Sequence, residues 1–217
     1  MSAAVILLAI TAIVGMTWAL FTDTQTVINH LHAGDLSITL KRTELTKTTL
    51  NESGYLVELP KNTKIVDFSN PTDENVFGLK NDTDGDAAEK IVPGSKFVAK
   101  MQIENNSDVA FGYWIKIVCT NKTNGENLAK QIKVTVNTGE DASSTVNDGL
   151  KVGSDDNFID VLAIGDSATF TVTVEFVDED YTYIDGVLTS PNNAAEHEVL
   201  NFDLVVYAVQ LTTDPTP

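Results

Sequence analysis

The sequence predicts an all-β fold: an antiparallel jelly-roll-like β-sandwich with short helical loop insertions, preceded by an N-terminal hydrophobic segment. Apolar residues recur with a period of two in six segments, and stretches rich in Asn, Asp, Ser, Thr and Gly separate them. A period of two is that of a half-buried strand. Short strands joined by polar connections are typical of sandwiches.

The predicted strands follow this alternation along the chain. The first spans 36–40, with Leu36, Ile38 and Leu40 on one face. The last, 202–209, is apolar on both faces, so we predict a central strand covered on both sides. Between them we expect strands at 97–103, 109–119, 132–136 and 169–176.

Polar connections are predicted between the strands. The longest span 69–88 and 138–148, and shorter ones span 51–54 and 189–193. Two short helices of a turn or two are expected within connections, and the last residues read as a disordered end. The predicted helices are 127–132 and 157–162.

Composition limits the classes of function. The chain of 217 residues carries 31 acidic and 14 basic residues, a formal net charge of −17 at pH 7. This balance repels nucleic acid and anionic membranes, which argues against a nucleic-acid partner, and it favours solubility or cation binding. The only cysteine, Cys119, cannot form an internal disulfide and lies in an apolar strand pattern, so we expect it to be buried.

The N-terminus is an apolar segment with no charge in residues 1–22. Thr17-Trp18-Ala19 fits the small-x-small rule of signal peptidase sites, so we expect cleavage between Ala19 and Leu20 and export of the protein. No Lys or Arg precedes the run, which keeps a second interpretation open. In that interpretation residues 1–19 remain as a hydrophobic helix, either in a pilin-like filament subunit or in a membrane-anchored surface domain.

These patterns divide the chain into four predicted parts. Residues 1–19 are a signal peptide or a retained helix, and 20–34 are a candidate donor strand. One sandwich domain spans 35–211, within the usual size of a single core, and 212–217 form a tail.

The segment that follows the predicted cleavage site is too apolar for a free tail. We expect it to add as a strand to the exposed sheet edge of a neighbouring copy, where backbone hydrogen bonds supply affinity. Such head-to-tail addition does not close, and it therefore builds a filament. The alternative is that this segment forms the first strand of its own sandwich. The predicted polymerisation residues are Leu20, Phe21, Val27, Ile28 and Leu31.

Several short motifs resemble the TasA and camelysin-like family. Residues 15–23, Asn29 and 33–38 resemble the start of that family, with its T-W-A site and A-G-x-L-x-L strand entry. Weaker similarities follow at 91–95 with 103–107, at 163–167 and at 206–210. The resemblance implies export through the dedicated signal peptidase SipW, a jelly-roll domain, and a homopolymer that forms extracellular biofilm-matrix fibres, with an accessory fibre protein as a further partner.

The same resemblance raises an enzyme alternative, because camelysin-like relatives have been described as metalloproteases. A zincin needs His-Glu-x-x-His on a helix, and the nearest match is His197-Glu198-Val199-Leu200-Asn201, which lacks the second histidine. His30 and His32 would share one face of a strand and form a zinc or copper site only with a further ligand. Walker, Rossmann and Gly-x-Ser-x-Gly motifs are missing from the sequence. We therefore expect no catalysis.

We expect no cofactor, and calcium is the most plausible ion if one is bound. Asp82, Asp84 and Asp86 lie on a glycine-containing stretch near Glu89, and Ca²⁺ prefers such hard oxygen ligands. The competing interpretation is an ordinary solvated acidic loop, which also applies to 155–156 and 178–180.

Four sequons lie in segments that are expected to be exposed. They permit N-glycosylation only in a host with that machinery. They begin at Asn51, Asn81, Asn105 and Asn121.

Overall fold

The computed structural model describes residues 36–51, 53–69, 75–78, 91–120, 125–179, 182–184, 187–195, 198 and 200–211. The predicted cleavage site, the donor segment 20–34, the calcium loop and the tail lie outside the described residues. None of the helices in the described ranges is long and apolar enough to cross a membrane.

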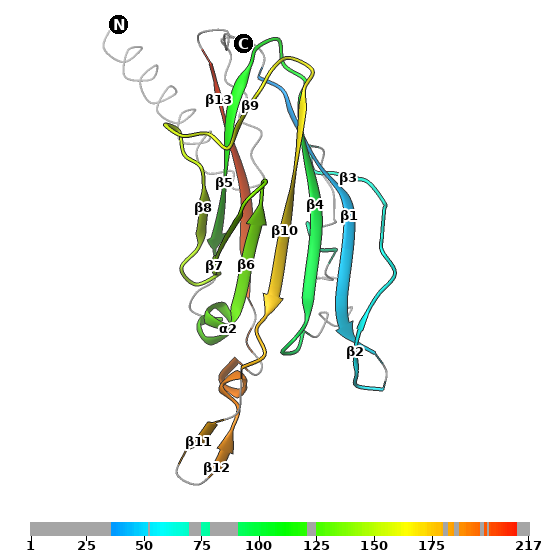
Figure 1. Ribbon diagram of the computed structural model, residues 1–217, viewed down its shortest axis with the longest axis vertical. Coiled ribbons are helices and arrows are strands. Elements are labelled where there is room, and N and C mark those ends of the chain that lie inside the picture. The colour runs from blue at the N-terminus through cyan, green and yellow to red at the C-terminus, as the bar shows by residue number, and fades with distance from the viewer. Residues whose placement is uncertain are drawn as a thin grey trace, which may run out of the picture.

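Two antiparallel sheets pack face to face, which confirms the predicted all-β sandwich (Figure 1). The larger sheet has the order β2-β1-β4-β10-β6-β7, with β3 also paired to β1. The smaller has the order β13-β5-β8, with β9 also paired to β5. The larger sheet consists of β1 (Ile38–Leu50), β2 (Leu56–Glu58), β3 (Val66–Asp67), β4 (Lys96–Asn105), β6 (Ile132–Asn137), β7 (Asp141–Thr145) and β10 (Ser167–Phe176).

The chain passes from one sheet to the other between β4 and β5, between β5 and β6, between β7 and β8, between β9 and β10 and, by way of the β11–β12 hairpin, between β10 and β13. The smaller sheet consists of β5 (Phe111–Cys119), β8 (Leu150–Val152), β9 (Asp160–Leu162) and β13 (Phe202–Gln210). One end carries α2 (Glu126–Gln131), the hairpin of β11 (Thr182–Ile184) and β12 (Val187–Thr189), and the 3₁₀ turn η2 (Pro191–Ala195) (Figure 1).

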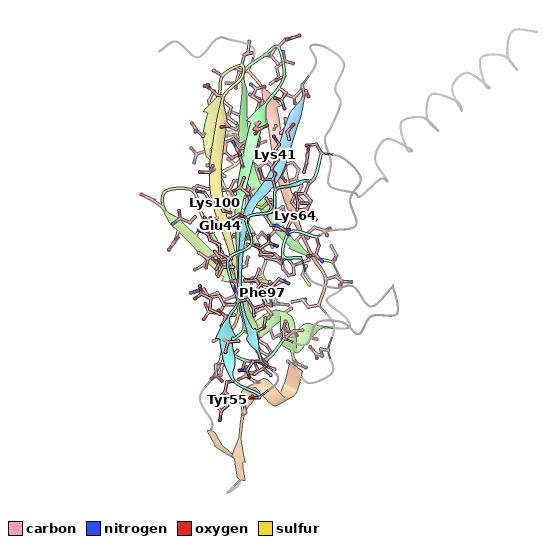
Figure 2. The ribbon with its side chains drawn as sticks, turned by 90° about the vertical axis from the view of Figure 1, so that its right-hand side faces the viewer. Lys41, Glu44, Tyr55, Lys64, Phe97 and Lys100 are labelled. Atoms are coloured by element: carbon pink, nitrogen blue, oxygen red, sulfur yellow. The ribbon has the colours of Figure 1, made fainter. Side chains whose placement is uncertain are left out.

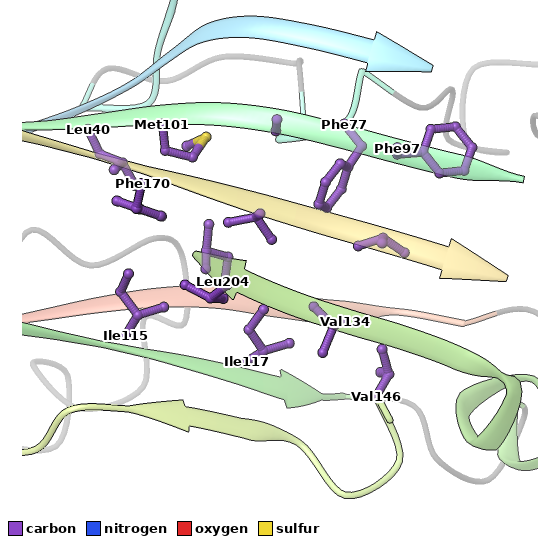
Figure 3. Close-up of a cluster of buried hydrophobic side chains, with 14 of the residues drawn as sticks. Leu40, Phe77, Phe97, Met101, Ile115, Ile117, Val134, Val146, Phe170 and Leu204 are labelled. Carbon is purple, nitrogen blue, oxygen red and sulfur yellow. The ribbon is translucent and has the colours of Figure 1, made fainter. Parts of the chain in front are cut away.

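The core lies between the two sheets, as the alternation predicts. Met101 and Phe170 from the larger sheet meet Ile115 and Ile117 from the smaller sheet (Figure 3). Each is at most 2% exposed, and complete burial of such a side chain stabilises the fold by about 1.5–3 kcal/mol. Cys119 is also buried, as predicted, and is a free thiol.

The first strand is much longer than predicted. It continues to Leu50 because a β-bulge between Arg42 and Glu44 shifts the alternation, so that Leu40, Arg42 and then Leu45 are buried. The buried arginine and the phase shift hide the second half of this strand from a period-two search.

Two loop predictions are wrong. The connection 138–148 contains β7, which pairs along β6 but carries mostly polar residues. The predicted helix at 157–162 is an irregular turn followed by β9, although the helix at 127–132 is confirmed by α2, shifted by one residue. The apolar spacing of Phe158, Ile159 and Leu162 resembles a helical face, but Phe158 covers Gly112 and Leu162 pairs with Phe111.

Asn105 fastens the end of the sandwich opposite to α2. Its backbone exchanges hydrogen bonds with Asp166 and Gly165, and its side-chain amide donates to Val109 O (2.9 Å) and Leu162 O (3.0 Å). Gly165 has a φ of +79°, a conformation that glycine adopts without strain. This turn therefore sets where β10 begins.

Candidate functional site at an open sheet edge

Strand β13 lies at the edge of the smaller sheet. It pairs with β5 over its whole length, from Phe202 opposite Cys119 to Gln210 opposite Phe111. No other strand in the described part of the chain pairs with it. The prediction of a central strand covered on both faces is therefore wrong for the sheet as described.

The hydrogen bonds at both ends of this ladder show which backbone groups point outwards. Thr120 N donates to Asn201 O (2.9 Å), and Leu211 N donates to Ala110 O (3.0 Å). In an antiparallel pair, facing residues alternate between hydrogen-bonded and non-hydrogen-bonded positions. The odd-numbered residues of β13 thus bond to β5, and the even-numbered residues direct their N–H and C=O groups away from it. We call this outward side of β13 the open edge.

The even-numbered residues of β13 also face the core, and their burial is incomplete. On the neighbouring strand β5, Phe111 and Ile115 are 0% exposed. On β13, Leu204 is buried, whereas Val206 and Ala208 are only partly buried. The apolar core is thus less well covered at the open edge than one strand further in, and a further strand with apolar side chains would bury more of it.

One end of the open edge is covered by the connection at 75–78. Phe77 packs against Phe97 of β4 and Phe202 of β13, with ring centroids 6.5 and 6.1 Å away. The guanidinium of Arg42, which is 1% exposed, donates to Asn75 O and Val76 O, both at 3.0 Å. This buried arginine ties the connection to β1 and leaves Val206 and Ala208 further along the edge.

On the outer face of the smaller sheet, aromatic contacts hold β13 against β5. Trp114 and Tyr207 face each other across the two strands and stack, with ring centroids 3.8 Å apart and an interplanar angle of 7°. From β8, on the other side of β5, Lys151 Nζ lies 4.7 Å from the Trp114 ring centroid. These contacts use the second apolar face of the 202–209 pattern and stabilise the pairing of β13 with β5.

On the core side of β5, the side chain of Tyr113 is buried in a poorly solvated region. Burial, and secondarily the charge of Asp160 on the neighbouring strand, raise the pKa of Tyr113 from 10.0 to about 12. The phenol therefore stays neutral at all physiological pH values.

Glu198, the glutamate of the incomplete zincin motif, has a structural partner. Its carboxylate accepts hydrogen bonds from Leu128 N (2.7 Å) and from Asn127 Nδ2 (2.8 Å) in the first turn of α2. Gly125, at the N-cap of α2, has no side chain to satisfy these N–H groups. Because a glycine at the N-cap has no side-chain acceptor, the sequence indicates that another part of the chain must cap this helix. The role of Glu198 as that cap was not predicted.

The other predicted ligands are not brought together by the described structure. His30, His32, His197, Asp82, Asp84 and Asp86 lie outside the described residues. The described ranges contain no group of three His, Cys, Asp or Glu residues that could hold a metal ion. The described residues of the other two predicted acidic loops, Asp155, Asp156, Asp178 and Glu179, are exposed and lie outside the strands.

One sequon prediction is wrong. Asn105 is 1% exposed, and its amide donates to three carbonyl groups, so it is not an exposed glycosylation acceptor in the folded protein. Asn51 is exposed, and Asn81 and Asn121 lie outside the described residues.

No protein-family model matches this sequence, and a search of curated proteins finds no match.

Proposed function

We propose that this protein is a secreted structural subunit that polymerises into extracellular filaments of the biofilm-matrix type. In this proposal the N-terminal segment of one subunit adds as a strand to the open edge of the next subunit. The supporting observation is the open edge itself: outward backbone groups on the even-numbered residues of β13, and partly covered core side chains at Val206 and Ala208.

The donor segment carries apolar residues on both faces of an extended strand. Phe21, Val27 and Leu31 share one face with Asp23, Gln25 and Asn29, and Leu20 and Ile28 share the other with Thr22, Thr24 and Thr26. With the first face turned towards the core, the added strand would cover the inner side chains of β13 and satisfy its outward N–H and C=O groups.

The geometry of addition determines the form of the polymer. A donor at the start of one chain and an acceptor near the end of another are different surfaces, so each subunit gives one contact and receives one. This heterologous contact propagates into a filament. If the segment instead pairs with its own β13, the same contacts produce a closed monomer.

The experiment compares the chain that begins at Leu20 with a chain that lacks residues 20–34. We expect the longer chain to form filaments by negative-stain microscopy, and the shorter one to stay monomeric with an unchanged β-type circular dichroism spectrum. A synthetic peptide of residues 20–33 should bind the shorter chain. Filaments of normal appearance from the shorter chain would contradict the proposal.

A pair of double variants separates strand insertion from a general effect of charge. Val27→Lys with Leu31→Lys places cations on the face that would be buried, and we expect loss of filaments. Thr24→Lys with Thr26→Lys adds the same charge on the opposite face and should leave filaments intact. Equal behaviour of the two would count against insertion.

A second candidate is a pilin-like filament that retains residues 1–19, because residues 1–22 carry no charged side chain and a helix of about 20 apolar residues can span a bilayer. The intact mass of the extracellular protein separates the two candidates. A mass that begins at Leu20 supports the donor-strand filament, whereas a mass that includes residues 1–19 supports the pilin-like one.

A further inference from the structure

The connection at 75–78, which covers one end of the open edge, is a tight turn. Its N–H groups bond within the turn: Phe77 N donates to Asn75 Oδ1 (3.1 Å), and Gly78 N donates to Asn75 O (3.0 Å). An asparagine side chain that bonds to the backbone two residues further on is a common way to fix a turn. Gly78 has a φ of +56°, which glycine adopts without strain.

The carbonyl groups of this turn are bonded to side chains of β1. Those of Asn75 and Val76 accept from the guanidinium of Arg42, both at 3.0 Å, and that of Gly78 accepts from Lys47 Nζ (2.8 Å). The turn is therefore fixed to β1. Because these N–H and C=O groups are already bonded, they are not available to a strand that lies beside β13.

Phe77 nevertheless fills the core at this place. Its side chain is 5% exposed and points into the space between the two sheets (Figure 3). Its ring lies against the rings of Phe97 on β4 and Phe202 on β13. Figure 2 shows Phe97 in the half of the sandwich nearer to α2, and Lys41 in the other half. At the Phe202 end of the open edge, Phe77 thus covers the core as an apolar side chain of a further strand would.

Further along β13 the described residues cover the core less completely. Leu204 is 9% exposed, whereas Val206 and Ala208 are only partly buried. The stretch that lies beyond Phe77 is 204–210, which is seven of the nine residues of β13. At about 3.4 Å per residue, a strand paired with this stretch would be about 24 Å long.

We infer that Phe77 sets the limit of strand addition: the added strand pairs with residues 204–210 of β13 and ends at the 75–78 connection. In this inference, which rests on the proposed function, the added strand is the N-terminal segment of a second copy. The partner must be an extended backbone, because the even-numbered residues of 204–210 direct N–H and C=O groups outwards. The segment 20–34 is about twice as long as this stretch, so about half of it remains outside the site and links the two subunits.

The test measures hydrogen exchange at single amides of β13 in the chain that begins at Leu20. Filaments of this chain are compared with monomers of the double variant Val27→Lys with Leu31→Lys, in which no strand is added. In filaments we expect exchange at Val206 N–H to slow by about tenfold or more and exchange at Phe202 N–H to stay unchanged. Equal slowing at Phe202 would overturn the inference, since the strand would then run past the 75–78 connection.

A matched pair of variants should move the limit. Arg42→Met removes the donor to Asn75 O and Val76 O and loosens the connection, so we expect the slowed exchange in filaments to extend to Phe202. Lys41→Met, at a neighbouring position of β1, should keep the exchange pattern of the unmodified chain. The same pattern in both variants would show that the connection does not set the limit. If Arg42→Met does not fold, the two amides of the unmodified chain still decide the question.

The same measurement separates this limit from strand addition itself. Slower exchange at both Val206 and Phe202 would support the proposed function and contradict only the limit at Phe77. Filaments in which neither amide exchanges more slowly would contradict both. If no filaments form, a synthetic peptide of residues 20–33 added to the double variant gives the same readout at the same two amides, and no slowing at either would again contradict both.

Discussion

Two sheet edges of this protein, the open edge of β13 and the β2–β3 edge of the larger sheet, differ in what they present. At the open edge, β13 directs backbone N–H and C=O groups outwards, and its core side chains are partly covered. At the edge of the larger sheet, the backbone of residues 56–68 is irregular and anchored to β1, and apolar side chains point outwards. The first edge offers backbone groups with which a further strand can pair and the second does not, so an edge should be judged by its unpaired backbone groups as well as by its exposed apolar residues.

The largest expected effect comes from proline at adjacent positions of β13. Val205→Pro removes an N–H that bonds to β5 and should destabilise the fold by about 3 kcal/mol or more. Val206→Pro removes an outward N–H instead, so the loss of stability should be smaller while filament formation is abolished.

Urea denaturation and negative-stain microscopy measure the two effects of this pair. Val206→Ala is the control for the lost side chain and should retain filaments. If Val206→Pro destabilises the fold as much as Val205→Pro does, the assignment of the outward groups is wrong.

Arg42, the buried arginine that ties the 75–78 connection to β1, should have the next largest effect on stability. Arg42→Met removes the hydrogen bonds to Asn75 O and Val76 O, which leaves two carbonyl groups without this donor. We expect a loss of about 2–4 kcal/mol in the free energy of unfolding, measured by urea denaturation. Lys41→Met removes an ion pair with Glu104, in which the two side chains are 27% and 25% exposed, and should cost at most about 1 kcal/mol. Similar losses for both would show that Arg42 does not hold the 75–78 connection.

The stack of Tyr207 on Trp114, on the outer face of the smaller sheet, should contribute less to stability. Tyr207→Ala removes the stack on Trp114 and should lower the free energy of unfolding by about 1–2 kcal/mol, with a blue shift or loss of the Trp114 near-ultraviolet circular dichroism signal. Tyr55→Ala, at a position that is 71% exposed, is the control and should change neither quantity. An unchanged spectrum in Tyr207→Ala would contradict the stacked geometry.

The effect of Tyr113 should appear only in alkaline solution. Its pKa is raised to about 12 in the folded protein, against 10.0 for the unperturbed group, so the fold favours the neutral phenol. The stability that depends on this group is complete below pH 10 and is lost as pH rises from 10 to 12. In Tyr113→Phe, thermal melts between pH 9 and 12 should show a weaker decline than those of the unmodified protein. An identical decline would indicate that other groups control alkaline unfolding.

The smallest effect is expected at the exposed apolar residue Leu59, beside β1 at the edge of the larger sheet. Leu59→Ser changes a side chain that is 40% exposed and should shift the free energy of unfolding by less than about 0.5 kcal/mol. Leu204→Ser, which changes a buried residue of β13, should cost about 2–5 kcal/mol. Chemical denaturation of both variants checks the contrast; a large loss of stability in Leu59→Ser would show that this exposed side chain supports the fold.

Much of the sandwich was predictable from the sequence, because strands with one buried face must alternate. Strands β5, β6 and β10 follow the predicted segments closely, since Phe170, Val172 and Val174 face the core at every second position. The second half of β1 was not predictable in this way, because the bulge shifts the alternation and Arg42 is buried through contacts with residues 33 and 34 positions away. Strand β7 was missed because its stability comes from pairing with β6 rather than from apolar residues of its own.

The open edge likewise combines features that the sequence predicts with features that only the tertiary structure decides. The sequence alone determined that 202–209 is an apolar strand and that an apolar segment lies near the N-terminus, since both depend only on the order of residues along the chain. Whether β13 is central or at an edge, which of its backbone groups point outwards, and that Glu198 caps α2 were decided by the tertiary structure. Each of these depends on which distant segment occupies the neighbouring position, and hydrophobic periodicity does not specify a strand's neighbours.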